Sequence, residues 1–182
     1  MTGVQTCALP ISKGLLKSAI RCDDPVLFIE NATVYQQRGE VPDGDFTIPI
    51  GKSKIQRKGR DVTLVTYSKM VPYSMKAAEQ LSGEGIDVEV VDLRSLRPLD
   101  MGPVIESFKH TNQAVIAEEG WESFGVGAEV ATRIYQEAFD YVDAPIQRVA
   151  QKEVPLPYNR HLEQLALPQV EDIIRAVKEV MR

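Results

Sequence analysis

The sequence contains few of the residues on which most catalytic and metal sites depend. Its 182 residues include two cysteines, Cys7 and Cys22, and two histidines, His110 and His161. Two cysteines supply neither a disulfide framework nor the ligand cluster of a zinc site. No nucleophile signature accompanies the histidines, so a serine-histidine-aspartate arrangement is not indicated. We interpret His110 as the solvated end of a helix and His161 as a surface loop residue.

Long hydrophobic runs and a basic surface are also absent. No apolar stretch approaches the roughly 20 residues that cross a bilayer. The formal net charge is −5, and the one dense basic run is Lys52–Arg60, so a general nucleic-acid binder is not expected. We therefore expect no membrane and no nucleic-acid partner, and a location in the bacterial cytoplasm or, in a eukaryote, an organelle matrix.

Residues 1–12 show no helical or strand periodicity and lack the basic start and apolar centre of a signal peptide. Their amino-acid sequence is similar to the translation of a sequencing-library adapter. We therefore expect a non-native segment outside the fold, a natural sequence that begins at Lys13, and no function for Cys7.

The stretch from residue 61 to residue 100 predicts a strand, a helix and a second strand. Val62–Tyr67 is a β-branched and aromatic run that suits a buried strand. A helix is expected after Ser68, which offers an N-cap, and before the glycines at 83 and 85. Val88–Leu93 is the second strand. Two strands joined in this way lie parallel, with a right-handed crossover.

The flanking segments extend this unit into a layered domain. Further strands are expected at Ala114–Ala117 and Ile146–Ala150, and the last helix is expected to start at Pro168, after a loop at Pro155–Leu167. Lys52–Arg57 is a weak strand, and a hairpin there would make it the antiparallel edge of the sheet. We predict an α/β fold with three layers, α/β/α, and a mostly parallel sheet with one antiparallel edge strand.

The domain boundary is expected near residue 51. Residues 13–50 contain the end of a helix, a strand at Val26–Glu30 and the polar, turn-rich stretch Asn31–Phe46. A connection of this length is unusual inside a compact domain, so we interpret it as a linker between domains. Residues 51–182 then form the layered domain.

Two patterns at the end of the third parallel strand are candidates for chemistry. Glu118 and Glu119 are expected where doubly wound folds place ligands, and could act as an acid/base pair or as a solvated or subunit-contact loop. Gly125-Val-Gly127 precedes a helix, but the third glycine of a dinucleotide fingerprint is missing, so the evidence for phosphate binding is weak. Trp121 and Phe124 could pack at an interface or stack on a ligand.

Eight segments of the chain resemble the beta subunits of thiamine-diphosphate-dependent 2-oxo acid dehydrogenases, and among them that of pyruvate dehydrogenase (acetyl-transferring). These segments are Lys13–Arg21, Leu27–Asn31, Gly39–Lys52, Val91–Asp100, Glu118–Trp121, Phe124–Glu129, Asp143–Pro145 and Leu167–Ile173. The resemblance implies a transketolase C-terminal domain at residues 51–182, preceded at 13–50 by the end of the pyrimidine-binding domain and a linker.

The resemblance also implies an assembly of two alpha and two beta subunits. This assembly decarboxylates pyruvate and reductively acetylates a lipoyl group on dihydrolipoyl acetyltransferase. The family's cofactor-activating glutamate and active-site histidine lie upstream of the position of Lys13, and its diphosphate and magnesium site belongs to the alpha subunit. The resemblance therefore implies no catalytic and no cofactor-binding residue here: thiamine diphosphate would be bound by the complete enzyme, and this part would be inactive alone.

The resemblance carries over one metal site, for potassium, at Ala19, Ile20, Cys22 and Asp24. Ligands there are largely backbone carbonyls, and carbonyls at a helix C-terminus attract cations. The family usually has aspartate where Cys22 stands and asparagine where Asp24 stands. An ordinary helix stop is the alternative.

Asp143 and the terminal carboxylate of Arg182 are candidates for docking the basic subunit-binding domain of the acetyltransferase. Two other functions stay open. One is a beta subunit of branched-chain 2-oxo acid or acetoin dehydrogenase. The other is a stand-alone nucleotide-binding module that uses the strand ends.

Overall fold

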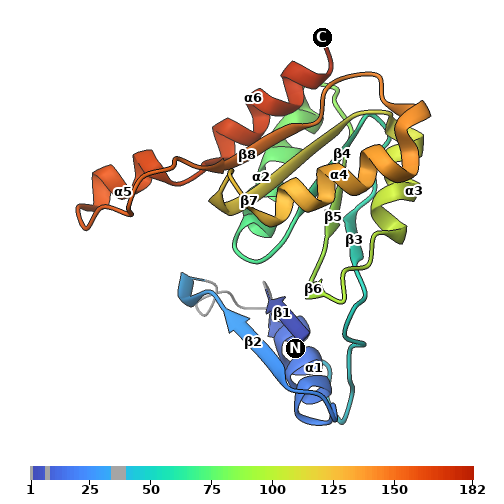
Figure 1. Cartoon of the computed structure of the whole chain (residues 1–182), viewed down its shortest axis with the longest axis vertical. Coiled ribbons are helices and arrows are strands. Elements are labelled where there is room, and N and C mark those ends of the chain that lie inside the picture. Colours follow the sequence, from blue (N-terminus) through green and yellow to red (C-terminus); the bar gives the residue numbers. More distant parts are fainter. Residues whose placement is uncertain (1, 7–8, 34–39) are drawn as a thin grey trace.

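The computed structural model describes residues 2–6, 9–33 and 40–182, and Figure 1 shows a small N-terminal lobe beside a larger sheet domain. The small lobe contains β1 (Thr2–Thr6), α1 (Leu9–Ile20) and β2 (Val26–Glu30). The sheet domain begins near residue 51. Its elements are β3 (Lys54–Arg57), β4 (Val62–Thr66), α2 (Met70–Gly83), β5 (Val88–Asp92), β6 (Ser95–Arg97), α3 (Gly102–Thr111), β7 (Ala114–Trp121), α4 (Val126–Ala138), a 3-10 turn (Phe139–Tyr141), β8 (Gln147–Gln151), α5 (Arg160–Ala166) and α6 (Val170–Val180).

The large sheet has the strand order β3-β5-β4-β7-β8. β4 pairs in parallel with β5 and β7, β7 pairs in parallel with β8, and β3 pairs antiparallel with β5. The predicted mostly parallel sheet with one antiparallel edge strand is confirmed. The predicted hairpin is wrong: β3 does not pair with the following strand β4 but with β5, one crossover later in the chain.

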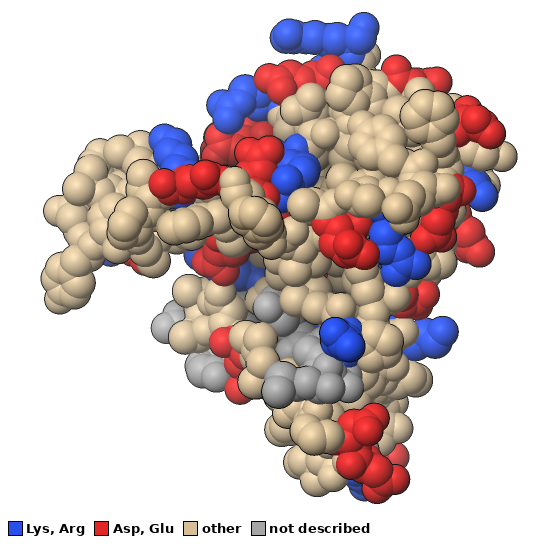
Figure 2. Space-filling model, in the orientation of Figure 1, with Lys and Arg blue, Asp and Glu red and all other residues tan. Residues whose placement is uncertain are grey.

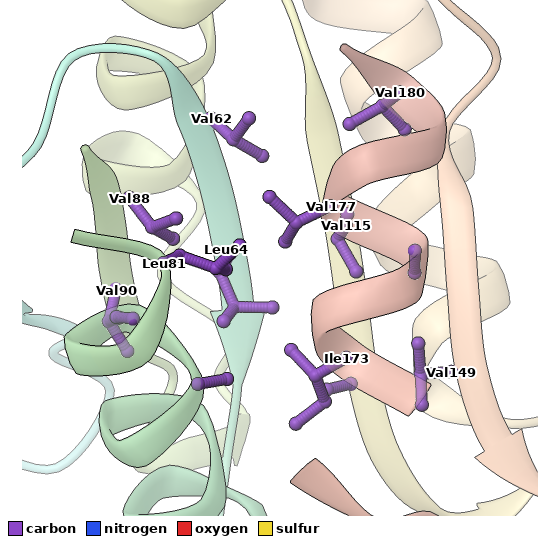
Figure 3. Close-up of a cluster of buried hydrophobic side chains, with 14 of the residues drawn as sticks. Val62, Leu64, Leu81, Val88, Val90, Val115, Val149, Ile173, Val177 and Val180 are labelled. Atoms are coloured by element: carbon purple, nitrogen blue, oxygen red, sulfur yellow. The ribbon is translucent and has the colours of Figure 1, made fainter. Parts of the chain in front are cut away.

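Each face of the sheet has its own hydrophobic core, so the domain has the predicted three layers. One core lies under α2 and α6, where Figure 3 shows strand and helix side chains converging. The other lies under α3 and α4. Alternation along each strand creates the division: Leu64 of β4 joins the first core and Val65 the second. Full burial of one such side chain stabilises the fold by about 1.5–3 kcal/mol.

The start of α2 differs from the prediction. Ser68 is not the N-cap, because it has a left-handed φ of 54° and the helix begins at Met70. Lys69 occupies the cap position and its side chain makes no capping hydrogen bond. Ser68 instead closes the turn after β4, where its carbonyl accepts a hydrogen bond from the amide of Val71 (3.1 Å).

The small lobe is tied to the sheet domain by a second, three-stranded sheet of order β2-β1-β6. β1 pairs in parallel with β2 and antiparallel with β6, which is part of the sheet domain. Ile11 and Leu15 of α1 are buried against Val71 of α2. The expectation that residues 1–12 lie outside the fold is therefore wrong for Thr2–Thr6 and Ile11. Their sequence lacks the alternation of a strand, but strands on both sides hold β1 in place.

The second half of the linker folds back on α1. Asp45 accepts hydrogen bonds from Lys17 (2.7 Å) and Arg21 (2.8 Å), and the backbone amide of Ile48 donates to the carbonyl of Gly14 in the helix (3.2 Å). A Cβ at Gly14 would lie 2.6 Å from Ile48, so the glycine permits this close approach. The linker predicted at Asn31–Phe46 includes residues 34–39, which lie outside the described residues.

Residues 152–169, here called the arm, leave the body of the sheet domain and carry α5 at their tip (Figure 1). The predicted loop at Pro155–Leu167 thus contains a two-turn helix, which Asn159 caps by accepting from the amides of His161 and Leu162. The arm exposes several large apolar side chains. These are Val154, Leu156, Tyr158, Leu162 and Leu165.

The face shown in Figure 2 has no large patch of only positive or only negative charge, because acidic and basic side chains are interspersed over the sheet domain. Within the part of the chain that the structure describes, no helix is both long and apolar enough to cross a membrane.

Candidate functional site at the carboxyl edge of the sheet

The carboxyl edge of the parallel strands gathers the polar groups that the sequence singled out. β7 continues past its pairing with β4, so Glu118 and Glu119 lie just beyond the edge of the hydrophobic core. Tyr67 follows β4 and Arg148 belongs to β8, and both reach the same place. Parallel strands end at one edge of a sheet, which explains how residues far apart in the sequence meet.

Glu118 is buried, with 1% of its surface exposed. One carboxylate oxygen accepts from the guanidinium of Arg148 (2.9 Å), and the other accepts from the hydroxyl of Tyr67 (3.1 Å). The backbone N–H of Gly127, in the first turn of α4, donates to both oxygens at 3.1 Å. The carboxylate is thus compensated by a guanidinium, a phenol and a helix N-terminus, as a buried charge requires.

The two glycines of Gly125-Val-Gly127 leave space for the carboxylate of Glu118. A Cβ at Gly127 would lie 2.5 Å from the carboxylate of Glu118, and one at Gly125 would lie 2.5 Å from the carbonyl oxygen of Trp121. Neither glycine has a left-handed φ, so the requirement is space and not backbone conformation. The helix N-terminus, which could have held a phosphate, holds the protein's own carboxylate.

The same environment acts on the phenol of Tyr67. Burial raises its pKa above the ordinary value of 10.0, and the charge and hydrogen bond of Glu118 raise the pKa further. Tyr67 therefore remains a neutral hydrogen-bond donor at physiological pH. Its hydrogen bond to Glu118 helps to hold the cluster together.

Glu119 lies on the outer side of the edge and has different partners. It accepts from Lys69, which precedes α2, and from the amide of Asn31 in the small lobe, both at 2.8 Å. Lys69 also lies 5.8 Å from the ring centre of Tyr73. Glu119 therefore links the two lobes. The two glutamates do not form an acid/base pair with each other, because each carboxylate has its own set of donors.

Two aromatic residues stand beside this cluster in the loop that leads to α4. Trp121 is 47% exposed, and Phe124 is fully exposed with a left-handed φ of 59°. A left-handed backbone is unfavourable for a bulky residue, so the loop holds Phe124 outward at a cost. The exposure of both rings leaves them available to an interface.

The histidines take no part in the cluster. His110 is exposed near the end of α3, where Nδ1 lies 2.8 Å from the carbonyl oxygen of Glu106. His161 is exposed in the first turn of α5. The solvated interpretation of both residues agrees with these positions.

The four residues predicted to bind potassium lie around the end of α1. The helix ends at Ile20, and the carbonyl of Ala19 accepts a hydrogen bond from the amide of Cys22 (3.3 Å). Cys22 is half-buried and Asp24 is exposed in the following turn. Among the described residues no three His, Cys, Asp or Glu side chains form a metal-binding group. A cation here would depend on carbonyl oxygens at the helix C-terminus.

The predicted docking residues lie at the opposite edge of the sheet. Asp143 is exposed just before β8 starts, and its backbone amide donates to the carbonyl of Asn112 (3.2 Å). Arg182 follows α6, which runs back from the carboxyl edge (Figure 1). Both residues thus belong to the amino edge, away from the Glu118 cluster.

Comparisons with known proteins match nearly the whole chain. Residues 51–173 fit a family model described as "Transketolase, C-terminal domain". The pyruvate dehydrogenase E1 component subunit beta of Rhizobium meliloti is 52% identical over 93% of this chain and 37% of its own length. The mitochondrial pyruvate dehydrogenase E1 component subunit beta-1 of Oryza sativa subsp. japonica is 50% identical over 92% of this chain and 46% of its own length. The chain thus spans half or less of these relatives.

A solved structure agrees with the fold as well. It is described as "Split gene transketolase, inactive beta4 tetramer", and it superposes with a TM-score of 0.81. The match covers 100% of this chain and 57% of the solved chain, with 26% sequence identity. The likeness therefore extends over both lobes.

Proposed function

Since the chain belongs to the transketolase C-terminal domain family, we propose that it is the carboxyl-terminal part of a pyruvate dehydrogenase beta subunit. The complete enzyme would decarboxylate pyruvate oxidatively and transfer the acetyl group to a lipoyl group. The observation that carries the proposal is identity of about half to two such beta subunits over more than nine-tenths of this chain. Branched-chain 2-oxo acid or acetoin dehydrogenase is the alternative substrate class.

The part played by this chain would be assembly, with catalysis in the complete enzyme. Thiamine diphosphate would supply carbanion-stabilising chemistry there. The described residues at the N-terminus of α4 do not fit its diphosphate, because the carboxylate of Glu118 already occupies the N–H of Gly127 there. The same observation argues against a stand-alone nucleotide-binding module. The chain's own residues would instead hold the sheet domain together and present surfaces to partner subunits.

A potassium ion at Ala19, Ile20, Cys22 and Asp24 belongs to this proposal. The carbonyls at the C-terminus of α1 and the carboxylate of Asp24 are hard oxygen ligands, which suit such a cation. Its role would be to fix the turn between α1 and β2. Thermal unfolding in potassium and in tetramethylammonium chloride at equal ionic strength tests this: potassium is expected to raise the melting temperature of the small lobe. An Asp24→Ala variant should respond less.

The activity is tested by reconstitution. This chain alone is expected to show neither tight thiamine diphosphate binding nor pyruvate turnover, because the groups that activate the cofactor lie outside it. Supplying the amino-terminal half of a related beta subunit together with an alpha subunit should restore pyruvate decarboxylation. Turnover of 2-oxoisovalerate in place of pyruvate would support the alternative substrate class. Turnover by the purified chain alone, free of host enzyme, would overturn the proposal.

Docking of an acetyltransferase is proposed for the amino edge of the sheet, at Asp143 and the terminal carboxylate of Arg182. The protein is acidic overall, with a net charge of −5, so a small basic domain would be steered to it. In the reconstituted enzyme, Asp143→Ala is expected to weaken binding by about 2 kcal/mol or more if the pair is desolvated. Calorimetry measures this, with Asp140→Ala as a neighbouring exposed control. Equal affinities for both variants at low salt would exclude Asp143.

A further inference from the structure

A cavity of about 440 Å³ lies between the arm and the body of the sheet domain. One wall comes from α2 and the residue before it, and the other comes from α5 and the end of the arm. Figure 1 shows α5 standing away from α2. Binding pockets for small molecules commonly have volumes of about 300–1,000 Å³. The cavity therefore has space for a small ligand that would contact both elements.

The charged side chains in this cavity are mainly basic, although the net charge of the whole protein is −5. Lys69, Lys76 and Arg160 line it, together with one acidic residue, Glu163. Lys69 is neutralised by Glu119, whose carboxylate lies 2.8 Å from its Nζ. Lys76 and Arg160 are exposed, and neither side chain has a hydrogen-bond or ion-pair partner among the described residues. Two cations with unused donors thus line one cavity from opposite walls.

The other lining residues favour an anion with a small polar body. The cavity reaches the first turn of α2 at Pro72, where the helix macrodipole is positive. In the described part of the chain the side-chain amide of Gln164 makes no hydrogen bond, so it can donate to a ligand. Tyr73 adds a half-buried ring to the wall. Glu163 could accept a hydrogen bond from a hydroxyl group that lies beside the anionic group of the ligand.

A phosphate group suits donors that approach from two walls. It has three terminal oxygens and a charge between about −1.5 and −2 at neutral pH, whereas a carboxylate has two oxygens and a single charge. The guanidinium of Arg160 can pair with two phosphate oxygens at once, and the ammonium group of Lys76 can bind another as a point charge. One phosphate group can therefore use both free cations.

We propose that this cavity binds the phosphate group of a small molecule between Lys76 of α2 and Arg160 of α5. Binding connects two elements that no ion pair joins within the described residues, so it fastens the arm to the body of the sheet domain. The phosphate group is supplied either by a small phosphate ester or by free phosphate. The inference goes beyond the proposed function and does not depend on it.

Calorimetric titration of the full chain with glycerol 3-phosphate and with inorganic phosphate, at constant ionic strength in chloride, tests the site. We expect saturable binding. Lys76→Gln and Arg160→Gln should each raise the Kd about tenfold or more, because each removes a charge-assisted hydrogen bond. Lys52→Gln is the matched control, since it removes the same charge from an exposed residue outside the cavity. Tighter binding of the ester would identify a phosphate ester as the ligand, and equal or tighter binding of inorganic phosphate would identify the free ion.

The proposal is overturned if neither probe binds saturably, or if Lys52→Gln weakens binding as much as the two cavity variants do. Hydrogen exchange locates the site independently. The amides of residues 160–166 should exchange more slowly in phosphate than in chloride, and Arg160→Gln should remove this difference. Protection in phosphate that excludes α5 would place the ion elsewhere and would also overturn the proposal. Turnover in the reconstitution experiment changes none of these outcomes.

Discussion

Glu118 determines what the carboxyl edge of the large sheet can bind, because its carboxylate occupies the N-terminus of α4. Its burial and its donors from three different elements make it the strongest polar feature in the described part of the chain. The sequence predicted where Glu118 and Glu119 would lie, at the carboxyl end of a strand. It could not predict that the two carboxylates have separate roles, because the partners Tyr67 and Arg148 are brought close only by the sheet. One signal was available: a carboxylate directly after a buried strand, followed by two closely spaced glycines.

Replacing Glu118 by glutamine should be costly. The amide keeps the shape of the side chain but removes the buried charge that faces Arg148, whose other carboxylate neighbour, Glu122, lies 4.0 Å away and is exposed. Breaking a buried ion pair in this way costs about 3 kcal/mol. Urea unfolding measures the loss. Glu119→Gln is the control, because this partly exposed pair with Lys69 should contribute less than about 1 kcal/mol. Similar losses for both variants would show that burial does not separate the two carboxylates.

Ionisation of Tyr67 should make the free energy of unfolding depend on pH in the alkaline range. Its pKa in the folded protein is raised above 10.0, so folding favours the protonated phenol. The stability that this provides is fully present below pH 10 and decreases as pH rises above 10, with a slope of about 1.4 kcal/mol per pH unit. Unfolding measured between pH 10 and pH 12 should show this slope in the wild type. Tyr67→Phe should lack it, while Tyr158→Phe, at a fully exposed ring, should retain it.

At the scale of elements, the sequence predicted the sheet well because its strands are short apolar runs between clear turns. β4, β5, β7 and β8 start within one residue of the predicted positions. The errors occurred where long-range pairing overrides local pattern. β3 crosses to β5, and β1 forms in a segment without strand periodicity. α5 was missed because a short helix inside a proline-containing stretch has too few residues to show a helical period.

The junction of β7 and α4 should tolerate alanine at one glycine and not at another. Gly127→Ala would place a methyl group 2.5 Å from the carboxylate of Glu118 and push it from the helix N-terminus, with a loss of about 1–3 kcal/mol. Gly120→Ala is the matched control, since nothing lies within 4 Å of a Cβ there. Its effect should be neutral or slightly stabilising. Denaturant midpoints compare the two; an equal loss would contradict the steric argument.

At the scale of the whole molecule, the two lobes are joined by few contacts. β1 bridges β2 and β6, and Asn31 reaches Glu119. Both contacts join segments about 90 residues apart in the sequence, which is why the sequence alone could not predict them. The hydrophobic cluster of the small lobe is completed by Val71 of α2 and contains far fewer buried residues than either core of the sheet domain. We infer that the sheet domain stabilises the small lobe and not the reverse.

Deleting residues 1–12 should therefore affect one lobe. The deletion removes β1 and the buried Ile11, and loss of one buried isoleucine alone costs about 2 kcal/mol or more. Hydrogen exchange should show lost protection in β2 and unchanged protection in β4 and β7. Ser12→Ala, which changes one half-buried side chain, provides a control. Unchanged protection of β2 after the deletion would mean that residues 1–12 contribute nothing to the small lobe.

The strand order β3-β5-β4-β7-β8 also has a consequence for the protein during its synthesis. β4 becomes the central strand, and each strand made after it adds to an edge that already exists: β5 on one side, then β7 and β8 on the other. β3, which is synthesised before β4, can pair as soon as β5 emerges from the ribosome. The face of β7 that α6 covers stays bare for longer, since about 50 residues separate the end of β7 from the start of α6. At about 5–20 residues per second, the ribosome needs roughly 2–10 s for them. During that interval the nascent chain exposes Val115 and Ala117 to solvent, and a chaperone that recognises apolar strands could bind them then.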